Sequence, residues 1–154
     1  MLLALLLLAS NAFPSPSWTS WMRPDAFRLV VGMNRADAVR VLAASGWKGE
    51  ETKEGHLLVD YAPNKSLTLG FREGRLHSIR FELFTMLPDI AKAFEEEKAY
   101  LEKTFGPPRK LKSKSIVLYD GVLPNVMVTL ANDPKSDHGK KGIGVLVVRY
   151  YDPR

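Results

Sequence analysis

The stretch that most constrains the fold is residues 66–83, SLTLGFREGRLHSIRFEL, which predicts a β-hairpin. Apolar residues alternate with polar or small ones on both sides of a turn at Glu73–Gly74. They are Leu67, Leu69 and Phe71 before the turn and Ile79, Phe81 and Leu83 after it. A period of two places each set on one face of an antiparallel sheet, and glycine suits the positive φ of a tight turn. Leu76 is out of phase with this pattern, so we expect a β-bulge near His77 and Ser78.

Helix signals precede and follow this hairpin. Asn34 is a suitable N-cap with Asp37 three residues later, and Gly46 is a suitable end for that first helix. A second helix is expected from Leu87-Pro88-Asp89 to Gly106-Pro107-Pro108, with residues 95–97, three glutamates, on a solvated face. Further strands are expected at residues 56–61, 115–120, 126–131 and 144–151.

The order of elements is therefore helix and three strands, twice. The two halves align at a spacing of about 60 residues, at which Gly46 corresponds to Gly106. This pattern predicts an α+β fold made of a duplicated α-β-β-β unit, with one antiparallel sheet and two helices packed on one face. We expect a single domain over residues 29–154, with repeats at 29–85 and 86–154.

The N-terminal region has the features of an exported chain. Residues 1–12 predict a signal peptide, because Leu2–Ala9 is an unbroken apolar run followed by small residues, although no Lys or Arg precedes it. The alternative is a buried N-terminal helix. Residues 13–28 predict a Pro/Ser-rich linker whose Trp18 and Trp21 either pack back on the domain or bind something. We expect a periplasmic or secreted protein with no transmembrane segment after signal removal.

The composition excludes some kinds of functional site and favours others. The 154 residues include no Cys, which excludes disulfides, a thiol nucleophile and a lipoprotein anchor. The formal net charge of +5 favours an anionic partner or surface, and Arg109–Lys114 with Lys135–Lys141 could form a basic patch. Nucleic acid is disfavoured, because no aromatic residues are interleaved with these charges.

No catalytic pattern is recognisable. The chain contains no phosphate-binding loop, no metalloprotease helix and no marked nucleophile. Asp133, Asp137 and His138 could hold a metal, but their loop is rich in Lys and Gly. We therefore expect no catalytic residues, no metal site and no cofactor.

The alternation also assigns an outer sheet face, turned away from the helices. In the first repeat this face is polar, whereas in the second it is unusually apolar. The predicted binding residues on it are Tyr119, Met127, Thr129, Val147, Arg149 and Tyr151. Tyr, Met and Arg are enriched in interfaces, and a contiguous apolar patch usually marks a contact. The alternative is that Trp18 and Trp21 fold over this face.

A family resemblance agrees with this assignment. GMNRADAVRVLAASG followed by LTLGFREGRLHSIRF resembles the helix-plus-sheet repeat of BamE-like outer-membrane assembly proteins. A tandem copy, over about Leu29–Tyr151, is similar to β-lactamase inhibitor protein. The chain lacks the lipobox cysteine of the first and the disulfides of the second. The resemblance implies a non-enzymatic, protein-binding module of the cell envelope. The alternative function is a small-molecule-binding protein or small hydrolase with a cleft between the repeats.

Overall fold

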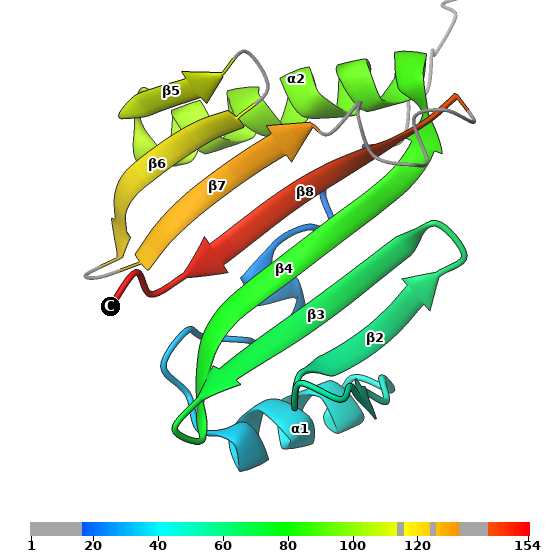
Figure 1. Cartoon of the computed structure of the whole chain (residues 1–154), viewed down its shortest axis with the longest axis vertical. Coiled ribbons are helices and arrows are strands. Elements are labelled where there is room, and N and C mark those ends of the chain that lie inside the picture. The colour runs from blue at the N-terminus through cyan, green and yellow to red at the C-terminus, as the bar shows by residue number, and fades with distance from the viewer. Residues whose placement is uncertain (1–16, 114–115, 124–125, 133–141) are drawn as a thin grey trace, which may run out of the picture.

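The computed structural model describes residues 17–113, 116–123, 126–132 and 142–154. It contains one antiparallel sheet in the order β1-β2-β3-β4-β8-β7-β6-β5 (Figure 1). The strands are β1 (Glu50–Glu51), β2 (Leu57–Ala62), β3 (Lys65–Arg72), β4 (Arg75–Met86), β5 (Lys110–Ser113), β6 (Ile116–Leu123), β7 (Val126–Asn132) and β8 (Ile143–Tyr151). The helices are η1 (Pro24–Phe27), α1 (Arg35–Ala44) and α2 (Leu87–Phe105).

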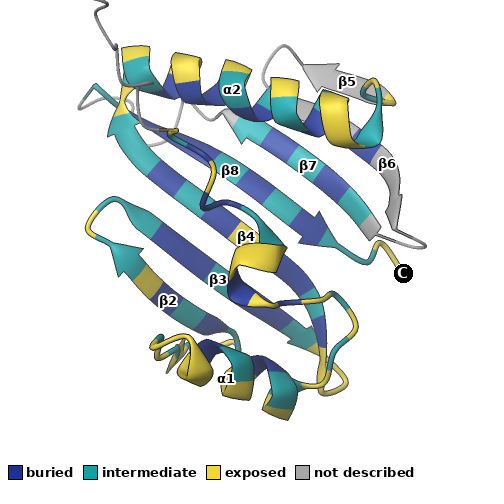
Figure 2. Ribbon diagram, turned by 180° about the vertical axis from the view of Figure 1, so that it is seen from behind, coloured by how far each residue is buried: buried dark blue, intermediate teal, exposed yellow. Residues whose placement is uncertain are grey.

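Both α-helices lie on the same face of the sheet, with η1 between them (Figure 2). The predicted α+β class, with an antiparallel sheet and two helices on one face, is therefore confirmed. The last strand of each half, β4 and β8, pair at the centre of the sheet. The helices and the sheet enclose one continuous core.

The central hairpin forms as its alternation predicts. In β3 and β4, Leu67 pairs with Phe81 and Leu69 with Ile79, and all four side chains are fully buried. Gly70 then pairs with Ser78 and Phe71 with Leu76, which leaves His77 as the extra residue of a bulge. The predicted bulge is confirmed, and it turns Leu76 into the core.

Helix α1 begins and ends where the sequence indicates, and α2 buries one face with one exception to the prediction. The Asn34 side chain accepts a hydrogen bond from the Asp37 amide at 2.8 Å, and Gly46 follows the helix with φ +83°. Helix α2 buries one face, formed by Ile90, Ala93, Phe94, Glu97 and Leu101. The expectation of a solvated glutamate run is wrong for Glu97, whose side chain is fully buried beside Arg23.

Part of the predicted linker belongs to the domain. Trp21, Met22 and Phe27 are buried in the core on the helix face of the sheet. The Trp21 ring stacks on Tyr61 at 5.3 Å between centroids and meets the edge of Phe81 at 5.7 Å. Residues 17–29, hereafter the N-terminal segment, fill the gap between α1 and α2 (Figure 2). The predicted signal peptide at residues 1–12 lies outside the described residues.

Candidate functional site

The face of the sheet opposite the helices is the candidate site, hereafter the open face. No helix in the described part of the chain covers it (Figure 1). Residues directly opposite each other in antiparallel strands share a face. The register therefore gives three rows that cross β4, β8 and β7. They are Ser78–Tyr151–Met127, Arg80–Arg149–Thr129 and Glu82–Val147–Ala131.

Five of the six predicted binding residues lie together on this face. They are Met127, Thr129, Val147, Arg149 and Tyr151, and each is partly buried. The core face of the same strands carries Val128, Leu130, Leu146 and Val148, which are fully or almost fully buried. The alternation in β7 and β8 therefore separates the two faces as predicted.

Tyr119 is the exception, and its assignment to the open face is wrong. It pairs with Val128 on the core side of β6 and is 1% exposed. Its hydroxyl donates to the backbone carbonyl of Lys98 in α2 at 3.4 Å. Burial, with a smaller effect of nearby glutamates, raises the pKa of Tyr119 to about 12. The sequence could not decide its face, because residues 116–119, IVLY, are apolar at both parities.

Charges on the open face are distributed unevenly. Arg80 pairs with Glu82 through Nη2 at 2.5 Å and through Nε at 2.8 Å. Ser66 donates a hydrogen bond to the same carboxylate at 3.2 Å. Arg149 stands directly opposite Arg80, and within the described residues it forms no ion pair with a carboxylate. Its guanidinium instead lies over the ring of Tyr151, 4.8 Å from the centroid.

The tryptophans do not cover this face. Trp21 lies against Phe81, whose side chain belongs to the core on the helix side, and Trp18 packs against the same core. The alternative expectation, that Trp18 and Trp21 fold over the apolar outer face, is wrong. Among the described residues, neither the helices nor the N-terminal segment covers Met127, Val147, Arg149 or Tyr151, and each of these side chains is partly exposed.

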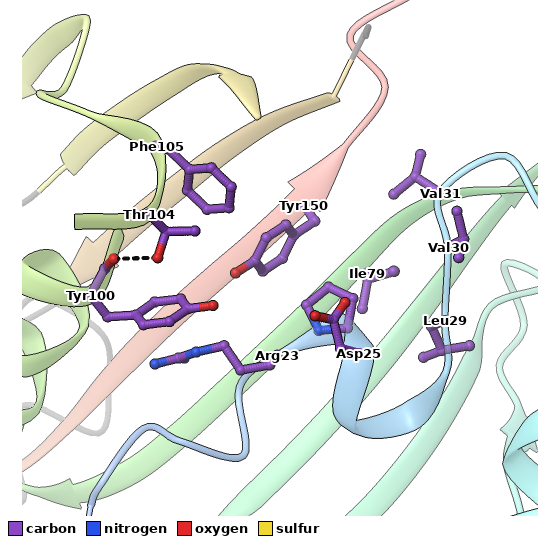
Figure 3. A pocket seen from close by; sticks show the side chains of 11 residues that line it. Arg23, Asp25, Leu29, Val30, Val31, Ile79, Tyr100, Thr104, Phe105 and Tyr150 are labelled. Carbon is purple, nitrogen blue, oxygen red and sulfur yellow. Dashed lines mark hydrogen bonds between the residues drawn. The ribbon is translucent and has the colours of Figure 1, made fainter. Parts of the chain in front are cut away.

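A cavity of about 240 Å³ is the second candidate site (Figure 3). It lies on the helix face, between the N-terminal segment, the C-terminal end of α2 and strands β4 and β8. Polar groups from Arg23, Asp25, Tyr100 and Tyr150 line it together with aliphatic side chains. Arg23 pairs with Glu97 at 2.7 Å and stacks on the Tyr100 ring, 3.4 Å from its centroid. The lining combines the N-terminal segment with residues from before and after residue 86.

Several residue groups that the sequence singled out do not belong to either candidate site. The candidate metal trio, Asp133, Asp137 and His138, and the basic run Lys135–Lys141 lie outside the described residues. The run Arg109–Lys114 includes β5, an edge strand that the sequence did not predict. Among the described residues, no three His, Asp or Glu side chains form a metal-binding group, and no helix is long and apolar enough to cross a membrane.

No family model matches this chain. It also matches no curated protein and no solved structure.

Proposed function

We propose that this protein is an exported, non-enzymatic protein-binding or envelope-associated module that binds its partner with the open face of β7, β8 and β4. The proposal rests on the composition of the open face where β7 and β8 form it. There, Met127, Val147 and Tyr151 lie beside Arg149 and are not covered by any described element. Antiparallel sheets usually present polar residues on a solvated face, so this composition favours a contact surface.

The open face is large enough for a stable complex. A specific interface buries about 800 Å² on each partner. Eight strands at a spacing of about 4.8 Å give a face roughly 35 Å wide. A partner that covered only β4, β8 and β7 would already contact all three rows of side chains.

The charges suggest the chemistry of the partner. Arg80 and Arg149 are directly opposite, and like charges in such pairs are unfavourable. Glu82 compensates Arg80, whereas the guanidinium of Arg149 meets the Tyr151 ring and no carboxylate among the residues that the structure describes. A carboxylate of the partner above Arg149, flanked by apolar contacts with Val147 and Met127, would complete this surface. The net charge of +5 would also attract an acidic partner.

The proposed location is the periplasm or the extracellular space. It depends on the apolar run at residues 2–9 and on the small residues that follow it. The resemblance to BamE-like repeats and to β-lactamase inhibitor protein supports a binding role in the same compartment.

Site-specific photo-crosslinking tests the binding face. A photoreactive amino acid replaces Val147 or Thr129 on the open face, and matched controls replace Arg40 on α1 or Glu95 on α2, both exposed. In cells that express the protein natively, we expect one discrete adduct from the two open-face positions and none from the helix positions. Adducts from the helix positions alone, or equal adducts from all four, would contradict the proposal.

Charge reversal tests the role of Arg149. We expect Arg149→Glu to abolish the adduct formed from position 147 while the melting temperature remains within a few degrees of the parent. Arg40→Glu is the matched control, because it makes the same charge change on the helix face. Loss of the adduct in the control as well would show that net charge, rather than the open face, directs the association.

A further inference from the structure

The cavity on the helix face of the sheet holds a buried polar group that has no hydrogen-bond partner among the described residues. Tyr150 is 5% exposed, and its side chain lies at the floor of the cavity beside Ile79. No hydrogen bond joins its hydroxyl to another residue in the part of the chain that the structure describes. Figure 3 shows this hydroxyl pointing into the space bounded by Tyr100 and Arg23. Buried polar groups are normally hydrogen-bonded, so this one is available to a bound molecule.

The polar end of the cavity carries little net charge. Both carboxylate oxygens of Glu97 accept hydrogen bonds from the Arg23 guanidinium, at 2.9 and 2.7 Å. Asp25 is exposed at the rim and would repel an anion. Burial raises the pKa of Tyr150, which keeps its phenol neutral and able to donate. The group that best matches this end is a neutral hydroxyl or carbonyl.

The remainder of the cavity is apolar. Its walls are formed by aliphatic and aromatic side chains of the N-terminal segment, of the following turn and of α2, namely Leu29, Val30, Val31 and Phe105. Its volume of about 240 Å³ is below the 300–1,000 Å³ of pockets for drug-sized ligands. It suits a molecule of about eight non-hydrogen atoms, since a water molecule occupies about 30 Å³.

We infer that this cavity binds a small neutral molecule with an apolar body and one hydroxyl or carbonyl group, held through the Tyr150 hydroxyl. The site lies on the opposite side of the sheet from the open face and does not depend on the proposed partner. Both halves contribute to it, β4 from the first and α2 with β8 from the second, and the N-terminal segment lines its remaining side. A ligand here would therefore contact both halves of the domain.

The test uses the full chain with three matched probes: phenol, toluene and benzoate. Phenol and toluene differ by a hydroxyl in place of a methyl, and benzoate adds a negative charge. Methyl NMR spectra of Ile79 and Val31 report on the cavity, and titration of each probe gives its affinity. We expect saturable shifts with phenol, an affinity for toluene about tenfold weaker, and the weakest binding for benzoate.

Tyr150→Phe keeps the ring and removes only the hydroxyl. We expect this variant to bind phenol about tenfold more weakly, to bind toluene unchanged and to keep or raise the melting temperature. The matched control is Tyr151→Phe, one residue along β8 but on the open face, which should alter neither affinity. Val31→Phe, which fills the cavity, should weaken both neutral probes. Non-saturable shifts would show that the cavity holds solvent only, and an unchanged phenol-to-toluene ratio in Tyr150→Phe would show that the Tyr150 hydroxyl does not hold the ligand; either result would overturn the inference.

Discussion

At the scale of single residues, two adjacent carboxylates attach the N-terminal segment to α2 in different ways. Glu96 is partly exposed and accepts hydrogen bonds from Ser17, from the Trp18 amide at 3.1 Å and from the Thr19 hydroxyl at 3.2 Å. Glu97 is fully buried and pairs with Arg23. Burial raises the pKa of Glu97, against the opposing effect of the Arg23 charge. We call these two carboxylates the exposed anchor (Glu96) and the buried anchor (Glu97). Their contributions to the free energy of unfolding should change with pH in opposite directions.

The exposed anchor should weaken in acid. Partial burial acts to raise the pKa of Glu96, but the hydrogen bonds from Ser17, Trp18 and Thr19 outweigh it and hold the pKa below its ordinary value of 4.5. A lowered pKa contributes stability that is present above 4.5 and lost as the pH falls through the folded-state value. We expect the free energy of unfolding to fall more steeply in the parent than in Glu96→Gln between about pH 5 and about pH 3.

Urea denaturation followed by tryptophan fluorescence measures this difference, since Trp18 and Trp21 lie in the attached segment. The control is Glu95→Gln, because Glu95 is exposed on the same helix. Parallel pH profiles for the parent and Glu96→Gln would contradict the assignment of Glu96 as an anchor.

These anchors could not be identified from the sequence. Residues 95–97 are identical glutamates, and helical periodicity around them is interrupted by Lys98. What distinguishes Glu97 is Arg23, which is 74 residues away in the chain and belongs to a stretch that resembles a linker. The caps at Asn34 and Gly46 were predictable because capping depends only on neighbouring residues.

At the scale of elements, alternation predicted the faces of strands in which at least one outward position is polar, as Thr129 is in β7 and Arg149 in β8. It separates the faces of β3, β4, β7 and β8, and it locates the bulge at His77. It fails in β6, where residues 116–119 are apolar at both parities and Tyr119 was assigned to the wrong face. The short edge strands β1 and β5 were missed because they contain two and four mostly charged residues, which resemble loops.

The contact between α2 and β8 depends on a missing side chain. A Cβ atom on Gly144 would lie 2.8 Å from Ile90 Cγ1 and 3.0 Å from Leu87 Cδ2. Gly144 therefore lets the start of α2 approach the sheet closely. We expect Gly144→Ala to lower the free energy of unfolding by about 1–3 kcal/mol, because overpacking displaces the helix.

A double-mutant cycle with Ile90→Ala tests this contact by urea denaturation. Removing the Ile90 side chain leaves room for the new methyl group, so the double variant should be more stable than the sum of the single effects predicts. Val147→Ala, on the open face of the same strand, is the control and should show only a small effect. Strict additivity of Gly144→Ala and Ile90→Ala would contradict the overpacking explanation.

At the scale of the whole molecule, the two halves share one core instead of packing two separate ones. Strands β4 and β8 pair from Ser78–Tyr151 to Met86–Ile143, and the Phe81 ring meets the Tyr150 ring edge-on at 6.4 Å. Trp21 and Phe27 of the N-terminal segment pack against the Phe81 ring on the helix face of the sheet. Removal of Phe81 should therefore destabilise both halves together, by about 3–5 kcal/mol for Phe81→Ala.

Two reporters in different halves can distinguish cooperative from independent unfolding. The three tryptophans, at positions 18, 21 and 47, report on the first half and its N-terminal segment, whereas amide hydrogen exchange in β7 reports on the second. We expect coincident urea midpoints in the parent and an equal shift of both in Phe81→Ala, because a domain with one core unfolds in a single transition. Leu42→Ala, on α1 in the first half, should also move both reporters. If β7 amides stay protected after tryptophan fluorescence has reached its unfolded value, the halves fold separately, and a ligand in the cavity between them could not stabilise both.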